Sequence, residues 1–585
     1  GLGEAVVSGA ITPDTFTVIK PPRHGKQFSF LEKTLGTKDH KHAYGYRDEG
    51  KVSSLETSDE ARRRFCLTDE EVFLLAETAV KIETYYGHPV DVEWAKDGVD
   101  RKMYIVQARP ATALKDHTVI TTMHVTVPSD MSAFLIGDCA SPGAAHGVAQ
   151  FILDPHDTQS FRPGNVLVTH RTDPDWVPIM RRAAAIVTDE GGRTSHAAIV
   201  ARELGKACIV GAHRATQKLD TKEITIDCGG GGKGIVYEGL LPLRADTLDL
   251  KPVITMHQDL KTKIMLILAD PIHAERYHFY PNNGIGLARL EFIMENMTQI
   301  HPRLALEERL TELTPEELGK LADLMAGYPN VTEYFVSKLA DGIAGLAASV
   351  YPNQVIVRFS DFKSNEYRGL LGGRFFEPQE ENPMLGFRGA SRYYHPEYLK
   401  AFHLECRAIK MVREKRGFEN VKVMVPFCRT PAEAEKVICA MKAGGLVRGR
   451  DGLEAYMMVE LPANVLMLED FAPHFDGFSI GSNDLTQLTV GIDRDAGALA
   501  HIADERNPAG RFLIKMAIEK AHALKKPIGI CGQAPSNHPE YAEFLVQCGI
   551  DSISVMPDAI PHTIENVLRA EKKLITHNII LYPVS

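Results

Sequence analysis

The stretch EAYMMVELPANVLMLEDFAPHFDGFSIGSND, residues 454–484, contains two short apolar runs separated by a gap long enough for a helix. The first run covers residues 454–461, and the second covers residues 477–484. A buried strand, a helix and a second buried strand form the repeating unit of folds with a parallel sheet. This stretch therefore predicts one unit of such a fold.

The same pattern continues on both sides, from residue 263 to about residue 575. Eight strand-like runs with helix-sized gaps predict an α/β fold, a (β/α)8 (TIM) barrel, with a doubly wound open sheet as the alternative. The gap between the second and third runs holds about 60 residues, so we expect extra helices there. The runs are Lys263–Asp270, Gly284–Glu291, Val355–Asp361, Val421–Phe427, Glu454–Leu461, Gly477–Asp484, Pro527–Gln533 and Ser552–Pro557.

Two further blocks precede the barrel, which indicates an α/β multidomain chain. The first block, residues 1–114, contains the capping box Thr68-Asp69-Glu70-Glu71, and an apolar-periodic helix follows it as far as Gly87. Two strand-like runs come next, Val90–Ala95 and Met103–Ala108. Their alternation predicts a pair of strands joined by a turn.

The second block, residues 125–240, has short strands around one clear helix, which runs from His196 to Leu204. The polar segment from Leu241 to Lys263 contains two prolines, and it predicts a linker to the barrel domain, residues 263–575. The run GGGGKG (229–234) formally matches a dinucleotide-binding fingerprint. It leads into another strand instead of a helix, so we expect a hairpin turn.

Composition narrows the class of protein. A length of 585 residues predicts about three to five domains. A net charge of −10 argues against nucleic-acid and anionic-membrane partners, and no apolar run reaches about 18 residues. Nine cysteines without a C-x-x-C pair favour a reduced, cytoplasmic compartment. The chain starts at Gly1 without Met, so we expect a longer protein.

Functional side chains stand at the carboxyl ends of the predicted barrel strands, where catalytic residues of such barrels lie. One polar strand end carries little information, but six of them meeting on one rim indicate a site. Reading these ends gives Asp270, Arg289, Arg358, Glu460, Asn483 with Asp484, and Cys531.

The chemistry of this set is that of an anion and metal site. Arg289 and Arg358, joined by Arg388 and Arg494, would bind an anion with two or more negative groups. Any one of these arginines alone would more often be a surface ion pair. Their joint placement favours a ligand.

Two carboxylates and a thiol complete the predicted rim. Glu460 and Asp484 lie on neighbouring strands, and two such ligands with substrate and water describe a Mg²⁺ site. Cys531 could be a proton donor or a nucleophile, although a lone cysteine is usually packing.

A second group of candidate residues lies in GGRTSHAA, residues 191–198. It stands between a predicted strand that ends at Thr188 and a predicted helix that starts at His196. A helix N-terminus offers free N–H groups and the positive end of a dipole. His196 could therefore carry a phosphoryl group. The alternative is a capping Thr or Ser followed by a partly buried histidine.

A third constellation follows the paired strands of the first block. Asp91 and Glu93 alternate on one strand, and Gln107 and Arg109 alternate on the other. These side chains could hold Mg²⁺ and nucleotide phosphates. A solvated strand face is the alternative.

The order of these motifs resembles the phosphoenolpyruvate-utilising enzymes. GGRTSHAAIVARELGKACIVG (191–211) resembles their phosphohistidine domain, and DVEWAKDG…YIVQARP resembles the end of an ATP-grasp nucleotide-binding domain. The segments that resemble their pyruvate-binding barrel are GIGLARLEF, VIVRFSDFKSNEY, ENPMLGFRGASRY, MMVELP, FSIGSNDLTQLTVGIDRD and GICGQAPS.

The resemblance implies a role for each candidate residue. His196 would be phosphorylated, and Cys531 would exchange the proton at the substrate methyl carbon. Mg²⁺ is the implied cofactor. Arg289 and Arg358 would bind the phosphate and carboxylate of the substrate; Glu460 and Asp484 would ligate Mg²⁺; Gly481, Ser482 and Asn483 would line the pocket; Glu93, Gln107 and Arg109 would face ATP and its metal.

The segment SDFKSNEYRGLLGG (360–373) resembles the branch that converts ATP, pyruvate and water into phosphoenolpyruvate, AMP and phosphate, a step of gluconeogenesis. The resemblance implies a cytoplasmic homodimer with small-molecule substrates and a central domain that swivels on linkers near 113–127 and 241–263. One alternative is a dikinase that uses inorganic phosphate, against which FKSNEY argues. Another is a phosphocarrier protein, against which IVQARP argues.

Overall fold

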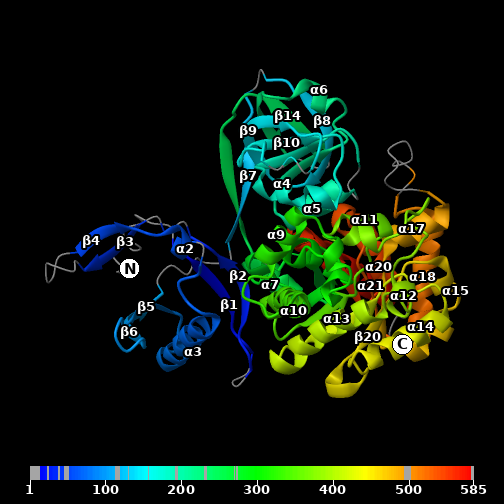
Figure 1. Cartoon of the computed structure of the whole chain (residues 1–585). Coiled ribbons are helices and arrows are strands. Elements are labelled where there is room, and N and C mark those ends of the chain that lie inside the picture. Colours follow the sequence, from blue (N-terminus) through cyan, green and yellow to red (C-terminus); the bar gives the residue numbers. More distant parts are fainter. Residues whose placement is uncertain are drawn as a thin grey trace. The chain divides into compact units, whose positions relative to one another are not determined.

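The computed structural model describes residues 13–22, 26–36, 38, 40–44, 52–62, 64–111, 119–128, 131–155, 157, 159–191, 195–228, 233–268, 270–271, 274–492, 502 and 504–581. The chain forms two compact units, Gly1–Asp116 and His117–Ser585 (Figure 1).

The first unit is built around helix α3, Asp69–Tyr86. The predicted capping box is confirmed: the Thr68 hydroxyl accepts a hydrogen bond from the Glu71 backbone N–H, and the Glu71 carboxylate accepts one from the Thr68 N–H. Gly87 ends the helix in a left-handed conformation. Three antiparallel strand pairs accompany the helix: β1 (Thr15–Ile19) with β2 (Ser29–Thr34), β3 (His40–Tyr44) with β4 (Val52–Glu56), and β5 (Val90–Lys96) with β6 (Met103–Pro110).

The second unit begins with a seven-stranded closed barrel that carries three short helices. Its helices are α4 (Val177–Arg182), α5 (His196–Glu203) and α6 (Ala215–Lys218). Its strands, in spatial order, are β10 (Val166–Thr169), β11 (Ala185–Thr188), β12 (Ala207–Val210), β8 (Leu135–Ser141), β14 (Lys233–Glu238), β13 (Glu223–Asp227) and β9 (Ala144–Phe151). Strands β13 and β14 pair antiparallel, so the glycine-rich run joins two strands as expected. Residues 229–232 themselves lie outside the described residues.

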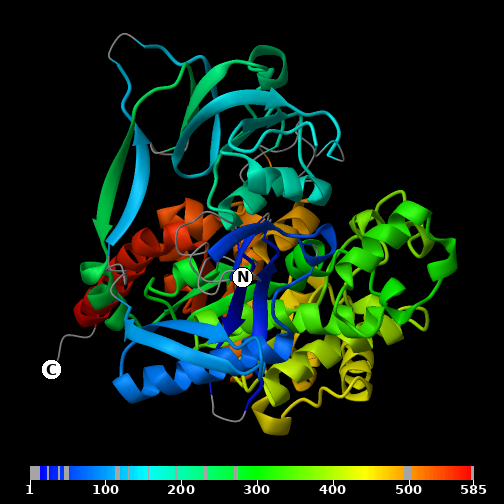
Figure 2. The same ribbon diagram turned by 60° about the vertical axis from the view of Figure 1, so that its left-hand side comes forward.

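The predicted linker from Leu241 to Lys263 is not an irregular segment, because it contains a strand and a helix. Strand β15 (Leu243–Asp249) pairs antiparallel with β7 (Val119–Val125), and helix α7 (Lys251–Gln258) follows. The two strands run side by side as a long ribbon (Figure 2). Proline usually breaks regular structure, but Pro252 stands in the first turn of α7, where the missing N–H has no intrahelical partner to lose.

The second barrel contains eight parallel strands that close on themselves, so the open-sheet alternative is excluded. Each predicted run coincides with one strand, although β18 starts one residue before its run. The extra helices before β18 include α8 (Leu290–Ile293), α9 (Pro315–Leu324) and α10 (Val331–Ser349). The strands are β16 (Lys263–Leu268), β17 (Gly284–Arg289), β18 (Gln354–Arg358), β19 (Val421–Val425), β20 (Ala455–Val459), β21 (Gly477–Ile480), β22 (Ile528–Ile530) and β23 (Ser552–Val555).

Helices cover the outside of this barrel (Figure 1). Inside, the buried side chains of Ile267, Ile356, Met424 and Met458 pack together and fill the centre. The rim at the carboxyl ends of the strands is therefore the place where polar side chains can meet. The remaining helices are α11 (Ser364–Gly369), α12 (Ala390–Tyr393), α13 (Leu399–Lys410), α14 (Pro431–Ala443), α15 (Pro462–Leu466), α16 (Leu468–Phe471), α17 (Ser482–Val490), α18 (Pro508–Ala523), α19 (Ala534–Asn537), α20 (Pro539–Gln547) and α21 (Ile560–Leu581).

Within the described part of the chain, no helix has the length and apolarity needed to cross a membrane.

Candidate active site

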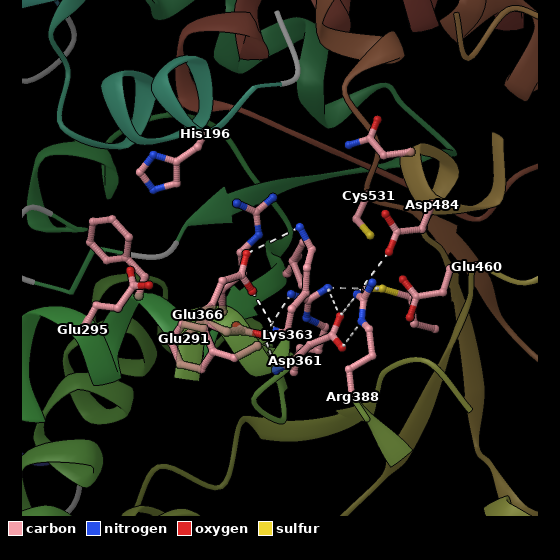
Figure 3. A pocket seen from close by; sticks show the side chains of 18 of the residues that line it. His196, Glu291, Glu295, Asp361, Lys363, Glu366, Arg388, Glu460, Asp484 and Cys531 are labelled. Carbon is pink, nitrogen blue, oxygen red and sulfur yellow. Dashed lines mark hydrogen bonds and ion pairs between the residues drawn. The ribbon is translucent and has the colours of Figure 1, made fainter. Parts of the chain in front are cut away.

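A pocket of about 220 Å³ lies at the carboxyl rim of the eight-stranded barrel, and helix α5 contributes His196 to its lining (Figure 3). Arg494 lies outside the described residues. The pocket brings together ten residues that the sequence singled out: His196, Arg289, Arg358, Arg388, Glu460, Gly481, Ser482, Asn483, Asp484 and Cys531.

His196 opens helix α5, where Ser195 is the N-cap residue. The hydroxyl of Thr172 lies 3.0 Å from Nδ1 of His196, which leaves Nε2 as the second ring nitrogen. Burial and the positive charges of Lys363 and Arg289 lower the pKa of His196 to about 3. The ring is therefore neutral at pH 7 and can act as a nucleophile.

A cluster of three buried carboxylates lies deeper in the pocket. Oxygen atoms of Asp361, Glu460 and Asp484 all lie within 4.8 Å of one another. Arg388 joins two of them, at 2.6 and 3.1 Å from the oxygens of Asp361 and 3.2 Å from Asp484 (Figure 3). Burial, with the negative charges of Asp361 and Asp484, raises the pKa of Glu460 to about 8. A cation is therefore favoured here.

The donor set suits Mg²⁺, which prefers a few carboxylate oxygens with water or substrate in its other positions. Glu460 and Asp484 both belong to this carboxylate cluster, and Asp361 adds a third carboxylate. Asn483 Oδ1 is buried beside them and accepts no hydrogen bond from the described residues. An unpartnered buried oxygen at this point is consistent with a ligand that is bound in the working site.

Arg358 is held by acidic neighbours on the same rim. It donates to Glu291 at 2.9 Å, and its guanidinium lies 3.5 Å from Asp361. Its Nε atom is buried and has no acceptor among the described residues. One donor of this guanidinium therefore remains for an anion in the pocket.

Several residues that line the pocket are not among the sequence predictions. Glu291 and Asp361 each close one of the predicted runs, so their positions carry a signal in the sequence, close to the predicted Arg289 and Arg358. Glu291 accepts the backbone N–H of Asp361 at 2.5 Å and so ties two strand ends together. Glu295, Lys363 and Glu366 also line the pocket. The last two belong to the segment SDFKSNEY, whose resemblance concerns the whole segment and points to neither residue.

Cys531 follows strand β22 and is buried, with its sulfur 3.5 Å from the Ile480 carbonyl. Burial raises the pKa of the Cys531 thiol to about 11. The group is therefore a protonated thiol at neutral pH, which suits a proton donor better than a thiolate nucleophile. Asp270, also read as a rim residue, is not among the lining residues and lies 3.6 Å from Arg181.

The three candidate nucleotide-binding residues lie in the first unit. Glu93 on β5 stands directly opposite Gln107 on β6, and Asp91 stands opposite Arg109. The guanidinium of Arg109 lies 3.7 Å from the Asp91 carboxylate, and all of these side chains are exposed. This face of the β5–β6 strand pair is therefore accessible to a ligand.

A neutral histidine over a pocket of arginines and carboxylates is the arrangement expected of an enzyme that moves a phosphoryl group. Comparison with known families agrees. Residues 246–572 match the family described as "PEP-utilising enzyme, PEP-binding domain", where PEP is phosphoenolpyruvate. Residues 161–231 match "PEP-utilising enzyme, mobile domain", and residues 1–126 match "Pyruvate phosphate dikinase, AMP/ATP-binding domain".

Comparison with individual curated proteins points to one branch of this family. A protein of Synechocystis is 48% identical over 98% of this chain and 70% of its own length. A protein of Aquifex aeolicus is 45% identical over 98% of the chain and 73% of its length, and one of Escherichia coli is 44% identical over 96% and 70%. All three are named phosphoenolpyruvate synthase. The chain belongs to the phosphoenolpyruvate synthase family of the PEP-utilising enzymes.

Proposed function

We propose that this chain is a phosphoenolpyruvate synthase, which converts ATP, pyruvate and water into phosphoenolpyruvate, AMP and phosphate by way of a phosphohistidine. The observation that carries the proposal is that His196, Arg289, Arg358 and a buried carboxylate cluster line one pocket. Such a pocket can hold a small dianion beside a nucleophile that is neutral at pH 7.

His196 is the phosphoryl carrier. Because Nδ1 faces the Thr172 hydroxyl, Nε2 is the nitrogen that takes the phosphoryl group. Arg289 and Arg358 bind the phosphate and carboxylate of phosphoenolpyruvate, and Arg388 holds Asp361 and Asp484 in place. Arg494 is proposed for the same anion on sequence grounds alone.

Glu460 and Asp484 are the proposed Mg²⁺ ligands, with Asp361 beside them. When bound, Mg²⁺ supplies positive charge to the enolate oxygen of pyruvate. The protein's own contribution is to keep these carboxylates buried and oriented, and to line the pocket with Gly481, Ser482 and Asn483.

Cys531 is the proposed proton donor to the methylene carbon of the enolate when phosphoenolpyruvate is turned into pyruvate. In the direction of synthesis the thiolate form of the same sulfur, the minor form at neutral pH, takes a proton from the methyl group and becomes the thiol. The raised pKa of this thiol keeps the proton on sulfur at neutral pH, so it is available for transfer.

Glu93, Gln107 and Arg109 are the proposed contacts to ATP and its metal.

A histidine that serves both ATP and pyruvate has to move between two sites. The β7–β15 ribbon joins the domain that carries α5 to the eight-stranded barrel, and we propose it as the hinge. Three predictions remain untested: the domain limits (1–114, 125–240 and 263–575), the cytoplasmic location and the homodimer. Light scattering of the purified protein tests whether it is a dimer.

The test of this function is the set of products. With ATP, pyruvate and Mg²⁺ but no added phosphate, the protein should form AMP, inorganic phosphate and phosphoenolpyruvate in equal amounts. A requirement for added phosphate, with pyrophosphate as product, would instead show a pyruvate, phosphate dikinase. Phosphorylation of a second protein without AMP formation would show a phosphocarrier.

A further inference from the structure

We propose that Arg202 is a positioning residue: a latch that fastens helix α5 to the loop after Cys531 and so fixes His196 over the pocket. The latch consists of Arg202 on α5 and of Gln533 and Asn537 on the barrel. The proposal rests on the proposed function and adds a residue that touches neither substrate nor metal.

The contacts of the latch are specific. The Arg202 guanidinium donates to the side-chain oxygen of Gln533, and it donates to Asn537 Oδ1 at 3.2 Å. Arg202 is 7% exposed and Gln533 1% exposed, so the hydrogen bond between them is shielded from water, whereas the hydrogen bond to Asn537 is partly buried. A planar guanidinium can serve two acceptors at once, which fixes direction as well as distance. Breaking this contact would cost free energy when the domain that carries α5 leaves the eight-stranded barrel.

The partner loop is itself anchored to the pocket. Gln533 is two residues after Cys531, and its backbone N–H donates to Glu505 at 3.1 Å. The second oxygen of Glu505 accepts the hydroxyl hydrogen of Ser482, which lines the pocket. Arg202 is therefore connected to the rim through three buried hydrogen bonds in series, which join Arg202 to Gln533, Gln533 to Glu505 and Glu505 to Ser482.

The place of Arg202 on α5 explains why this matters for transfer. His196 stands at the first position of the helix, and Arg202 stands in its last turn. Six residues of α-helix span about 9 Å, and a helix transmits position rigidly over that length. Fastening one end of α5 to the barrel thus sets the distance between the other end and the bound substrate.

A second contact of the same domain keeps α5 from pivoting on the latch. Arg181 on α4 donates to Asn296 at 3.3 Å and lies 3.6 Å from the Asp270 carboxylate. Its guanidinium also lies 5.8 Å from the centre of the Phe292 ring. Two separated anchor points define an orientation, whereas one alone would leave rotation free.

The experiment is single-turnover phosphoryl transfer from phosphoenolpyruvate to His196, followed by rapid quench over a range of substrate concentrations. Arg202→Met should lower the limiting rate by ~10- to 100-fold, because a small misplacement of the nucleophile has that effect. The half-saturating substrate concentration should not change, because Arg202 does not line the pocket. Arg202→Lys, which keeps the charge but loses the fork, should give an intermediate rate.

Arg182→Met is the matched control, because Arg182 is on the same helix as Arg181 and donates within its own domain, to the Phe161 carbonyl. Its transfer rate should equal that of the parent. Asn537→Ala removes one of the two acceptors of the latch on the barrel side, and it should slow transfer even if Arg202→Met does not fold. A parental rate in both Arg202→Met and Asn537→Ala, or an equal loss in Arg182→Met, would overturn the latch.

A physical readout separates the latch from the proposed function. Spin labels at the exposed positions Leu153 and Leu466, with Cys66 and Cys439 changed to Ser, report the distance between the two domains. Arg202→Met should reduce the docked population even if phosphoenolpyruvate donates nothing. An unchanged distance distribution would exclude the latch, whereas a parent protein that is never phosphorylated would exclude the function alone.

Discussion

The hydroxyl of Thr172 lies 3.0 Å from Nδ1 of His196. Since the His196 ring is neutral, one nitrogen carries the hydrogen and the other keeps a lone pair. If Nδ1–H donates to Thr172, Nε2 is the nucleophilic atom. The orientation of the carrier would then be set by a residue from the loop after β10.

The first prediction concerns this ring. In ¹⁵N NMR of histidine-labelled protein, His196 should stay neutral from about pH 8 to about pH 5, through the ordinary histidine pKa. It should be the Nδ1–H tautomer. Thr172→Val should mix the tautomers and slow transfer, while Thr172→Ser should preserve both properties. A ring that titrates near pH 6.5 would contradict the assignment.

The second prediction concerns Cys531. Cys531→Ala should abolish the exchange of pyruvate methyl protons for deuterium, a loss of about 10²- to 10⁴-fold, which is typical of removing a general acid or base. The exchange is followed by ¹H NMR in D₂O with Mg²⁺. Cys428→Ala is the matched control, because Cys428 is equally buried on the same rim but is not among the lining residues. Parental exchange in Cys531→Ala would remove this thiol from the mechanism.

The third prediction concerns the metal. Glu460→Gln and Asp484→Asn should each weaken Mg²⁺ binding by more than the ~10- to 100-fold that loss of an outer-shell partner costs. Calorimetric titration with Mg²⁺ measures the loss. Glu454→Gln, at the opposite end of β20 and paired with Lys422, should bind Mg²⁺ as the parent does. If all three variants bind alike, the metal site lies elsewhere.

The fourth prediction concerns a buried carboxyl behind the rim. Glu405 accepts hydrogen bonds from the backbone N–H and the hydroxyl of Ser360, and burial raises its pKa to about 7. A folded-state pKa above the unfolded value gives stability below the unfolded pKa that is lost as pH rises through about 7.

Glu405→Gln should remove this pH dependence, because the amide never ionises. The free energy of unfolding of the parent should fall by about 1–3 kcal/mol between pH 5 and pH 8, and that of the variant should not. Urea unfolding at several pH values measures both. An identical pH profile for the two proteins would contradict the pKa direction.

Much of the fold could be predicted because its signals are local. Seven of the eight strands of the second barrel lie within the predicted runs, and β18 starts one residue before its run. The capping box at Thr68 and the boundary at Gly87 follow from side-chain chemistry. Six of the ten site residues could be found because parallel strands bring their carboxyl ends to one rim, namely Arg289, Arg358, Glu460, Asn483, Asp484 and Cys531. His196 could be found from its place at a helix start. The β7–β15 ribbon could not be found, because its strands lie far apart in the sequence and their polar residues also suit a linker.

The remaining errors concern which way a rim side chain points. Asp270 and Asp361 both close apolar runs, yet only Asp361 lines the pocket. Asp270 lies beside Arg181 of another domain. Arg202 reads as an ordinary last-turn helix residue, and only the packing of two domains gives it partners. Contacts between domains leave no periodic signal in one sequence.

The central claim is that phosphoenolpyruvate and His196 exchange a phosphoryl group in this pocket. The most direct measurement is the intact mass of the protein after incubation with phosphoenolpyruvate and Mg²⁺, in the parent and in His196→Ala. The account predicts a mass gain of one phosphoryl group in the parent, which is lost in acid as expected of phosphohistidine and absent in His196→Ala. A folded parent protein that gains no mass, or a His196→Ala variant that gains the same mass, would contradict it.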